Sequence, residues 1–300
     1  MNQILPIIVW LCLPLLAEAP KPDDLTREFK GEAVAKERTD DEAVQAYSIV
    51  LNKLLPRMGI GKIRDRRGDQ QTFQQICWRA ARPGAEKDRL AVCKAICLKL
   101  GKATPKPARE WLIKQLNHIG RDESVETLAA LLSDEVASIR EQARRALMNN
   151  PANSSGTALR DALEKAETVE WRLALINALA YRNAAENIPL LTKYASDENE
   201  DIRTAAIKAL VPIGNAKTAA VIAKALEKGS RRTGAAVSDA YLRLADRLAG
   251  KNDRSNALAI YRKLLSQNGH LKCAAIIGLG RAGGLTELPL IFEAMEDTDS

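Results

Sequence analysis

Four stretches of the chain decide its fold: AREWLIKQLNHIG at 108–120, IREQARRALMNN at 139–150, WRLALINALAYR at 171–182 and IRTAAIKALVPIG at 202–214. When they are aligned, an arginine recurs at spacings of 31, 32 and 31 residues, as Arg109, Arg140, Arg172 and Arg203. A leucine recurs at the same spacings, as Leu116, Leu147, Leu179 and Leu210. Self-similarity at a fixed period of this length is the signature of a repeat architecture.

Each period also contains a second apolar stretch, which lies outside the arginine block. These stretches are SVETLAALLSD at 124–134, GTALRDALEKA at 156–166, NIPLLTKYASD at 187–197 and TAAVIAKALEKG at 218–229. Their apolar residues recur at spacings of three and four, which predicts amphipathic helices. Polar turns separate the two helices of each period, and Gly120 and Gly214 are placed to end helices. The predicted unit is therefore a helical hairpin of about 31 residues.

A single hairpin of this kind cannot cover its own apolar face, so neighbouring hairpins must stack side by side. The composition agrees, since 46% of the residues are hydrophobic but only 4% are aromatic. Alanines in the repeated helices, such as Ala143, Ala178 and Ala206, allow helices to approach closely. We predict an all-α chain.

The repeated pattern D-x-x-x-x-[IV]-R-x-x-A-x-x-A-L is clearest in Asp134–Leu147 and Asp197–Leu210. It resembles the HEAT family, and more narrowly the short bacterial HEAT-like repeats of phycobilisome-lyase-type proteins, over about residues 88–300. The resemblance implies a right-handed α-α superhelix, a HEAT-like solenoid, which we expect to begin with an N-terminal helical cap. It also implies that the arginine column is structural and binds the acidic turns of its own or a neighbouring repeat.

The first 19 residues are interpreted as a signal peptide. Residues 4–17 (ILPIIVWLCLPLLA) are almost entirely apolar, but this run is shorter than the roughly 20 residues that a membrane-spanning helix needs. The segment before it contains no Lys or Arg, so an uncleaved membrane anchor is the alternative. We expect export to the periplasm or the extracellular space and no membrane span beyond the signal segment.

The rest of the chain is divided into two parts. Residues 20–69 form an N-terminal segment with a predicted helix at 41–55 and a charged connector at 59–68, interpreted as a solvated linker rather than an anion site. Residues 70–300 form the repeat array. A longer, irregular unit at about 230–267 resembles a tetratricopeptide-type hairpin. The apolar stretch at 288–300 parallels that at 188–200, so we expect the array to continue beyond residue 300.

Cysteines add one structural hypothesis. Cys77 and Cys93 flank a predicted turn at 82–84, where two antiparallel helices would bring them to similar heights. A disulfide across this loop would stabilise an exported chain, and Cys97, one turn beyond Cys93, could compete for it. The alternative is that these thiols are buried and act as small hydrophobic side chains.

The sequence lacks the patterns of known catalytic, metal and cofactor sites. It has only two histidines, and no Cys or His pair has zinc-ligand spacing. Phosphate-binding and nucleotide-binding glycine motifs and the nucleophile elbow are missing. We therefore expect no enzyme activity, no cofactor, no metal and no small-molecule substrate.

The remaining hypothesis is a binding scaffold that takes another protein or an acidic surface. Lys114, Arg145, Asn177 and Lys208 form a column, five residues after each arginine, that could meet a partner. The net charge of +7 suits an acidic partner. The alternative is a docking module of a lyase-like enzyme. Nucleic-acid binding is a weaker hypothesis, because the basic residues are dispersed and interrupted by acidic clusters.

Overall fold

The computed structural model describes residues 38–59, 61–227, 230, 233–267 and 269–296. Over these residues the chain is all-α, as predicted, and contains no strand. It divides into two compact units, with the boundary between Ala95 and Ile96. The proposed signal segment at 1–19, with Cys12, lies outside the described residues.

The first unit contains α2 (Asp40–Met58), α3 (Ile63–Ala80) and most of α4 (Glu86–Cys97). A reciprocal capping box starts α2, in which the Thr39 hydroxyl accepts the Glu42 N–H and the Glu42 carboxylate accepts the Thr39 N–H. Helix α2 packs on α3, and the half-exposed Arg57 pairs with the buried Asp69 at 2.8 Å. The predicted helix at 41–55 is therefore present and slightly longer.

The predicted connector at 59–68 was largely wrong. Helix α3 already begins at Ile63, so most of that segment is the first two turns of a helix. Arginine and other long polar residues are good helix formers, and the Asp65 carboxylate accepts the Lys62 N–H at the helix start. The high charge of the segment indicated exposure correctly, but exposure alone does not distinguish a linker from a solvated helix.

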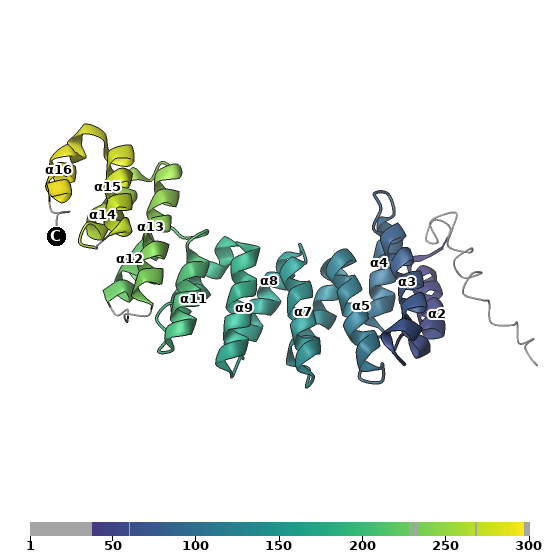
Figure 1. Ribbon diagram of the computed structural model, residues 1–300. Helices are drawn as coiled ribbons and strands as arrows, with labels where there is room; N and C mark the ends of the chain where they lie inside the picture. Colours follow the sequence, from purple (N-terminus) through teal and green to yellow (C-terminus); the bar gives the residue numbers. More distant parts are fainter. Residues whose placement is uncertain (1–37, 60, 228–229, 231–232, 268, 297–300) are drawn as a thin grey trace, which may run out of the picture. The chain divides into compact units, whose positions relative to one another are not determined.

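The second unit is a stack of helical hairpins (Figure 1). One row, which we call the second-helix row, contains the arginine columns and consists of α5 (Lys106–Ile119), α7 (Ala137–Asn149), α9 (Val169–Arg182) and α11 (Glu200–Leu210). The other, the first-helix row, consists of α6 (Asp122–Ala130), α8 (Asn153–Glu164), α10 (Ile188–Tyr194) and α12 (Ala216–Glu227). In the second-helix row, α5 packs on α7, α7 on α9 and α9 on α11.

The hairpins continue in the same unit with α13 (Gly234–Gly250), α14 (Arg254–Leu264), α15 (His270–Gly283) and α16 (Leu288–Glu296). The irregular segment predicted at 230–267 is thus a hairpin of α13 and α14, which pack tightly on each other and on α15. Helix α13 has 17 residues, whereas α11 has 11, which accounts for much of the longer spacing.

The leucine column forms the core of the stack. Leu116, Leu147, Leu179 and Leu210 are all at most 1% exposed. Alanines beside them, at 143, 146, 178, 206 and 209, are at most 2% exposed and let adjacent helices approach closely. Each fully buried leucine contributes roughly 1.5–3 kcal/mol relative to an exposed one, which is why the period is so visible in the sequence.

The arginine column lies at the turns between paired helices. Arg140 donates to the Asp134 carbonyl oxygen at 2.7 Å, Arg203 to that of Asp197 at 2.7 Å, and Arg172 to that of Ala166 at 2.9 Å. These bonds go to main-chain carbonyls and not to the acidic side chains of the turns. Arg109 differs, since it pairs with the Asp134 carboxylate of the following repeat.

Two further arginines, not singled out in the sequence, connect neighbouring repeats. Arg182, at the end of α9, donates to the carbonyl oxygen of Leu147 in the last turn of α7 at 2.9 Å and to that of Ala152, beyond the end of α7, at 2.7 Å. Arg247, near the end of α13, donates in the same way to the Gly214 carbonyl after α11. Their spacing of 65 residues, close to two periods, was the available signal.

Candidate partner-binding surface

The predicted column lies on the solvent side of the second-helix row. Lys114 is on α5, Arg145 on α7, Asn177 on α9 and Lys208 on α11, and all four side chains are exposed. Each of these helices packs on the next (Figure 1), so the helices that carry the four side chains follow one another along the row. The stacking of repeats therefore brings together residues that are about 31 positions apart in the chain.

A hollow of about 520 Å³ lies between α5 and α7 and includes the first two members of the column. Its lining consists of three cations, a histidine, three amides and a methionine: Lys114, Arg144, Arg145, His118, Asn117, Gln142, Asn149 and Met148. No carboxylate is among these lining residues. The hollow is therefore rich in hydrogen-bond donors and carries net positive charge.

Glu141, on the same helix as the two arginines, neutralises part of this charge. Its carboxylate accepts a bidentate pair of bonds from Arg144, at 2.7 and 2.8 Å, and one from Arg145 Nε at 2.6 Å. Arg144 and then Arg145 hold the pKa of the Glu141 carboxyl below its usual range. Arg144 Nη1 also donates to Met148 Sδ at 3.7 Å, so each of its three guanidinium nitrogens has a partner.

The other two cations keep free donors. Arg145 is exposed and uses only Nε for Glu141, which leaves its two terminal nitrogens available. Among the described residues, the Lys114 ammonium has neither an ion pair nor a hydrogen bond. An arginine fork and a lysine ammonium are the groups that proteins use to bind carboxylates and phosphates.

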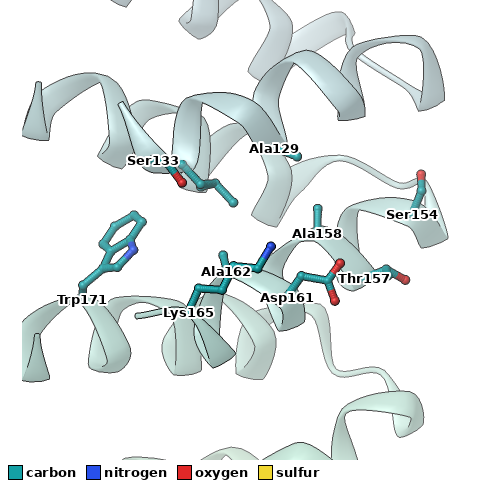
Figure 2. A pocket seen from close by; sticks show the side chains of 10 residues that line it. Ala129, Ser133, Ser154, Thr157, Ala158, Asp161, Ala162, Lys165 and Trp171 are labelled. Atoms are coloured by element: carbon teal, nitrogen blue, oxygen red, sulfur yellow. The ribbon is translucent and has the colours of Figure 1, made fainter. Parts of the chain in front are cut away.

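A second cavity, of about 440 Å³, opens on the first-helix side of the same unit (Figure 2). Asp161 and Lys165 project into it from the end of α8, Trp171 lies at one end and Ser154 at the other. The Trp171 ring is covered by the Arg140 guanidinium at 6.0 Å. This cavity has one acidic and one basic side chain, so it lacks the uniform charge of the hollow between α5 and α7.

The cysteines in the described part of the chain are free thiols there, and a disulfide between Cys77 and Cys93 stays a prediction. Cys77 and Cys93 are fully buried, and burial raises the pKa of the Cys77 thiol far above its ordinary value. Cys93 lies beneath Arg89, with the guanidinium 3.8 Å from its sulfur. The alternative reading, that these thiols fill the core as small hydrophobic side chains, fits their burial.

The described residues include no cluster of three or more His, Cys, Asp or Glu side chains that could hold a metal ion.

One described segment, His270–Glu296, is long and apolar enough to cross a membrane by length and composition. It comprises α15 and α16, which pack on each other and are separated by a left-handed backbone at Gly284 (φ +65°). Leu285, Phe292 and Met295 expose 83, 60 and 54% of their surface there.

Comparison with family models agrees with this architecture over part of the second unit. The family described as HEAT repeats matches residues 156–241. No curated protein sequence matches the chain. Its structure is similar to that of an engineered protein, with 17% identity, a TM-score of 0.43, and coverage of 91% of this chain and 87% of the other.

Two natural proteins are similar at the same level. The complex of CpcE and CpcF of phycocyanin lyase from a Nostoc species has 16% identity, a TM-score of 0.38, and coverage of 84% of this chain and 96% of the other. The Cnd3–Cnd2 condensin subcomplex of S. pombe has 13% identity, a TM-score of 0.44, and coverage of 93% and 44%. The match to HEAT repeats covers residues 156–241, and hairpins with the same arginine and leucine columns lie on its N-terminal side.

Proposed function

We propose that this HEAT-repeat chain is a non-catalytic scaffold that binds an acidic surface of a partner protein along its second-helix row. The observation that carries this proposal is the exposed column of Lys114, Arg145, Asn177 and Lys208 on four helices packed in order. Three of these four side chains are cationic. Their regular placement presents a row of positive charge to one partner surface.

The arginines of the repeat strengthen the argument by contrast. Carbonyl oxygens in the turns accept hydrogen bonds from Arg140, Arg172 and Arg203, so these arginines contribute to the fold rather than to an interface. Lys114 and Lys208 have no such structural partner among the described residues. Exposed charges of this kind speed association with an oppositely charged partner and make binding sensitive to salt.

A triple variant tests the proposal: Lys114→Glu, Arg145→Glu and Lys208→Glu. The matched control is Lys165→Glu, Lys217→Glu and Lys224→Glu, which changes the net charge equally at exposed positions on the first-helix side. Proteins retained by the full chain from its source cells are compared by quantitative mass spectrometry. We expect the column variant to lose acidic partners that the control keeps. Equal retention by both variants, or loss only from the control, contradicts the proposal.

Export is a second part of the proposed function and rests on the apolar segment at residues 4–17. N-terminal sequencing of the mature protein tests it. We expect a new N-terminus near residue 18 or 20 in an exported fraction. An intact Met1 in a protein that stays with the cytosol contradicts export, and an intact Met1 in the membrane fraction supports the anchored alternative instead.

A further inference from the structure

The hollow between α5 and α7 keeps many hydrogen-bond donors that have no partner within the described chain. Lys114 keeps all three ammonium donors, and Arg145 keeps the donors of both terminal nitrogens. The Asn117 amide oxygen accepts from Asn149 at 2.8 Å, and the NH₂ group of this lining residue is a further donor. A ligand that satisfies these groups must supply several acceptor oxygens and negative charge.

The hollow is too large for a single small oxyanion to fill it. A volume of about 520 Å³ is in the range of ligand pockets of about 300–1,000 Å³, many times the roughly 30 Å³ of one water molecule. Open on the solvent side, it can hold a stretch of chain together with the side chains that reach its cations. An extended peptide with carboxylate side chains meets both requirements.

The spacing of the helices adds a constraint on that peptide. Packed helices lie about 8–10 Å apart, and the column places one polar side chain on each helix of the row. A chain extended as a polyproline II helix has three residues per turn and rises about 3.1 Å per residue, so side chains three residues apart lie on one face and roughly 9 Å from each other. Carboxylates at every third position would therefore meet Lys114 and Arg145 in turn. Consecutive carboxylates would crowd one helix and miss the next.

We propose that the hollow between α5 and α7 is the anchor for an extended acidic segment of the partner, with carboxylate side chains three residues apart. The inference rests on the proposed function and deepens it, because it names the chemistry and the register of the partner. Lys114 binds one carboxylate through its ammonium group. Arg145 binds the next through its two terminal nitrogens, while its Nε stays on Glu141.

Two synthetic peptides of equal length and charge test the register. One has aspartate at every third of twelve positions, with glycine and serine between, and the other has the same four aspartates in a row. Binding to the full chain is measured by titration calorimetry at low salt, with inorganic phosphate and a single-stranded oligonucleotide as further ligands. We expect the spaced peptide to bind about tenfold more tightly than the clustered one.

The double variant Lys114→Gln, Arg145→Gln locates the site, and Lys217→Gln, Lys224→Gln is its matched control. We expect the first to weaken the spaced peptide about tenfold and the control to leave it unchanged. Equal binding of the two peptides, tighter binding of phosphate or the oligonucleotide, or an unaffected double variant overturns the inference. The triple variant of the column tests binding of whole partner proteins, whereas the two peptides test the spacing of the carboxylates. If the triple variant loses its partners but both peptides bind equally, only this inference is contradicted and the proposed function stands.

Discussion

The buried pair of Arg109 and Asp134 provides the sharpest test of how the repeats hold one another. Arg109 lies on α5 and Asp134 in the turn before α7, so the pair joins neighbouring repeats. Their side chains are only 6% and 7% exposed. The Asp134 carboxylate also accepts the Val136 N–H at 2.9 Å, just before α7 begins. We predict that Asp134→Ala destabilises the second unit strongly.

The magnitude follows from what the substitution leaves behind. Arg109 would stay buried without its carboxylate, and its Nε already has no hydrogen-bond partner. Breaking one side of a buried ion pair costs about 3–5 kcal/mol. Loss of the bond to Val136 resembles loss of a helix cap, which costs about 1 kcal/mol. Since one side chain makes both contacts, we expect a total in the upper part of the 3–5 kcal/mol range.

Urea unfolding of the full chain, followed by circular dichroism, measures this cost. Asp134→Asn separates the two contributions, because an asparagine oxygen can still accept the Val136 N–H but carries no charge. Arg109→Met combined with Asp134→Asn removes both charges and should recover most of the loss. Glu135→Ala, in the same turn, removes the exposed pair with Lys102 and should change little.

The result that would refute this reasoning is a loss below about 1 kcal/mol for Asp134→Ala, the size typical of a surface pair. A double variant no more stable than Asp134→Ala would also contradict it. The first outcome would mean that Arg109 reaches water when its partner is removed. The second would mean that the pair contributes through packing rather than through its charge.

Three further predictions concern other described groups. Arg182→Gln should lower the free energy of unfolding by about 2–3 kcal/mol, because charged bonds to the carbonyls at the end of α7 are lost, and urea unfolding should show it. Arg144 depresses the pKa of Glu141, so this carboxylate stabilises the fold above the unfolded-state pKa of about 4.3. That contribution is lost as the pH falls through the lower folded-state pKa, and Glu141→Gln should flatten the acid limb of a stability titration, whereas an unchanged limb would contradict the assignment. Burial raises the pKa of Cys97 to about 11, so near pH 8 peptide mapping should find the exposed Cys273 alkylated well before Cys97, and equal rates would show that α4 opens readily.

The amino-acid sequence determined the hairpin repeat before any tertiary contact was known. A buried leucine and small alanines must recur whenever one hairpin packs on the next, so the period appears directly in residues such as Leu147 and Leu179. The apolar face of a helix is made of residues three and four positions apart, so it can be recognised from a short stretch of sequence. The all-α class and the row of Lys114, Arg145, Asn177 and Lys208 therefore followed from the pattern alone.

Local charge was a weaker guide. The segment at 59–68 was interpreted as a linker because it is polar, yet α3 begins within it at Ile63. The cysteines at 77 and 93 do lie on either side of a turn, and each is buried as a free thiol in the described structure. Spacing along the chain sets only the greatest possible distance between two side chains, whereas their actual separation depends on how the helices rotate and pack.

Tertiary structure alone decided which side chains meet across repeats. Arg109 reaches Asp134, Arg182 reaches the end of α7, and Lys114 joins Arg145 around one hollow, each over about 25 to 35 residues of chain. No local rule relates such positions, since their contact depends on the distance and rotation between stacked helices. Those two quantities are set by the packing of the buried leucines and alanines, and the proposed binding surface depends on them.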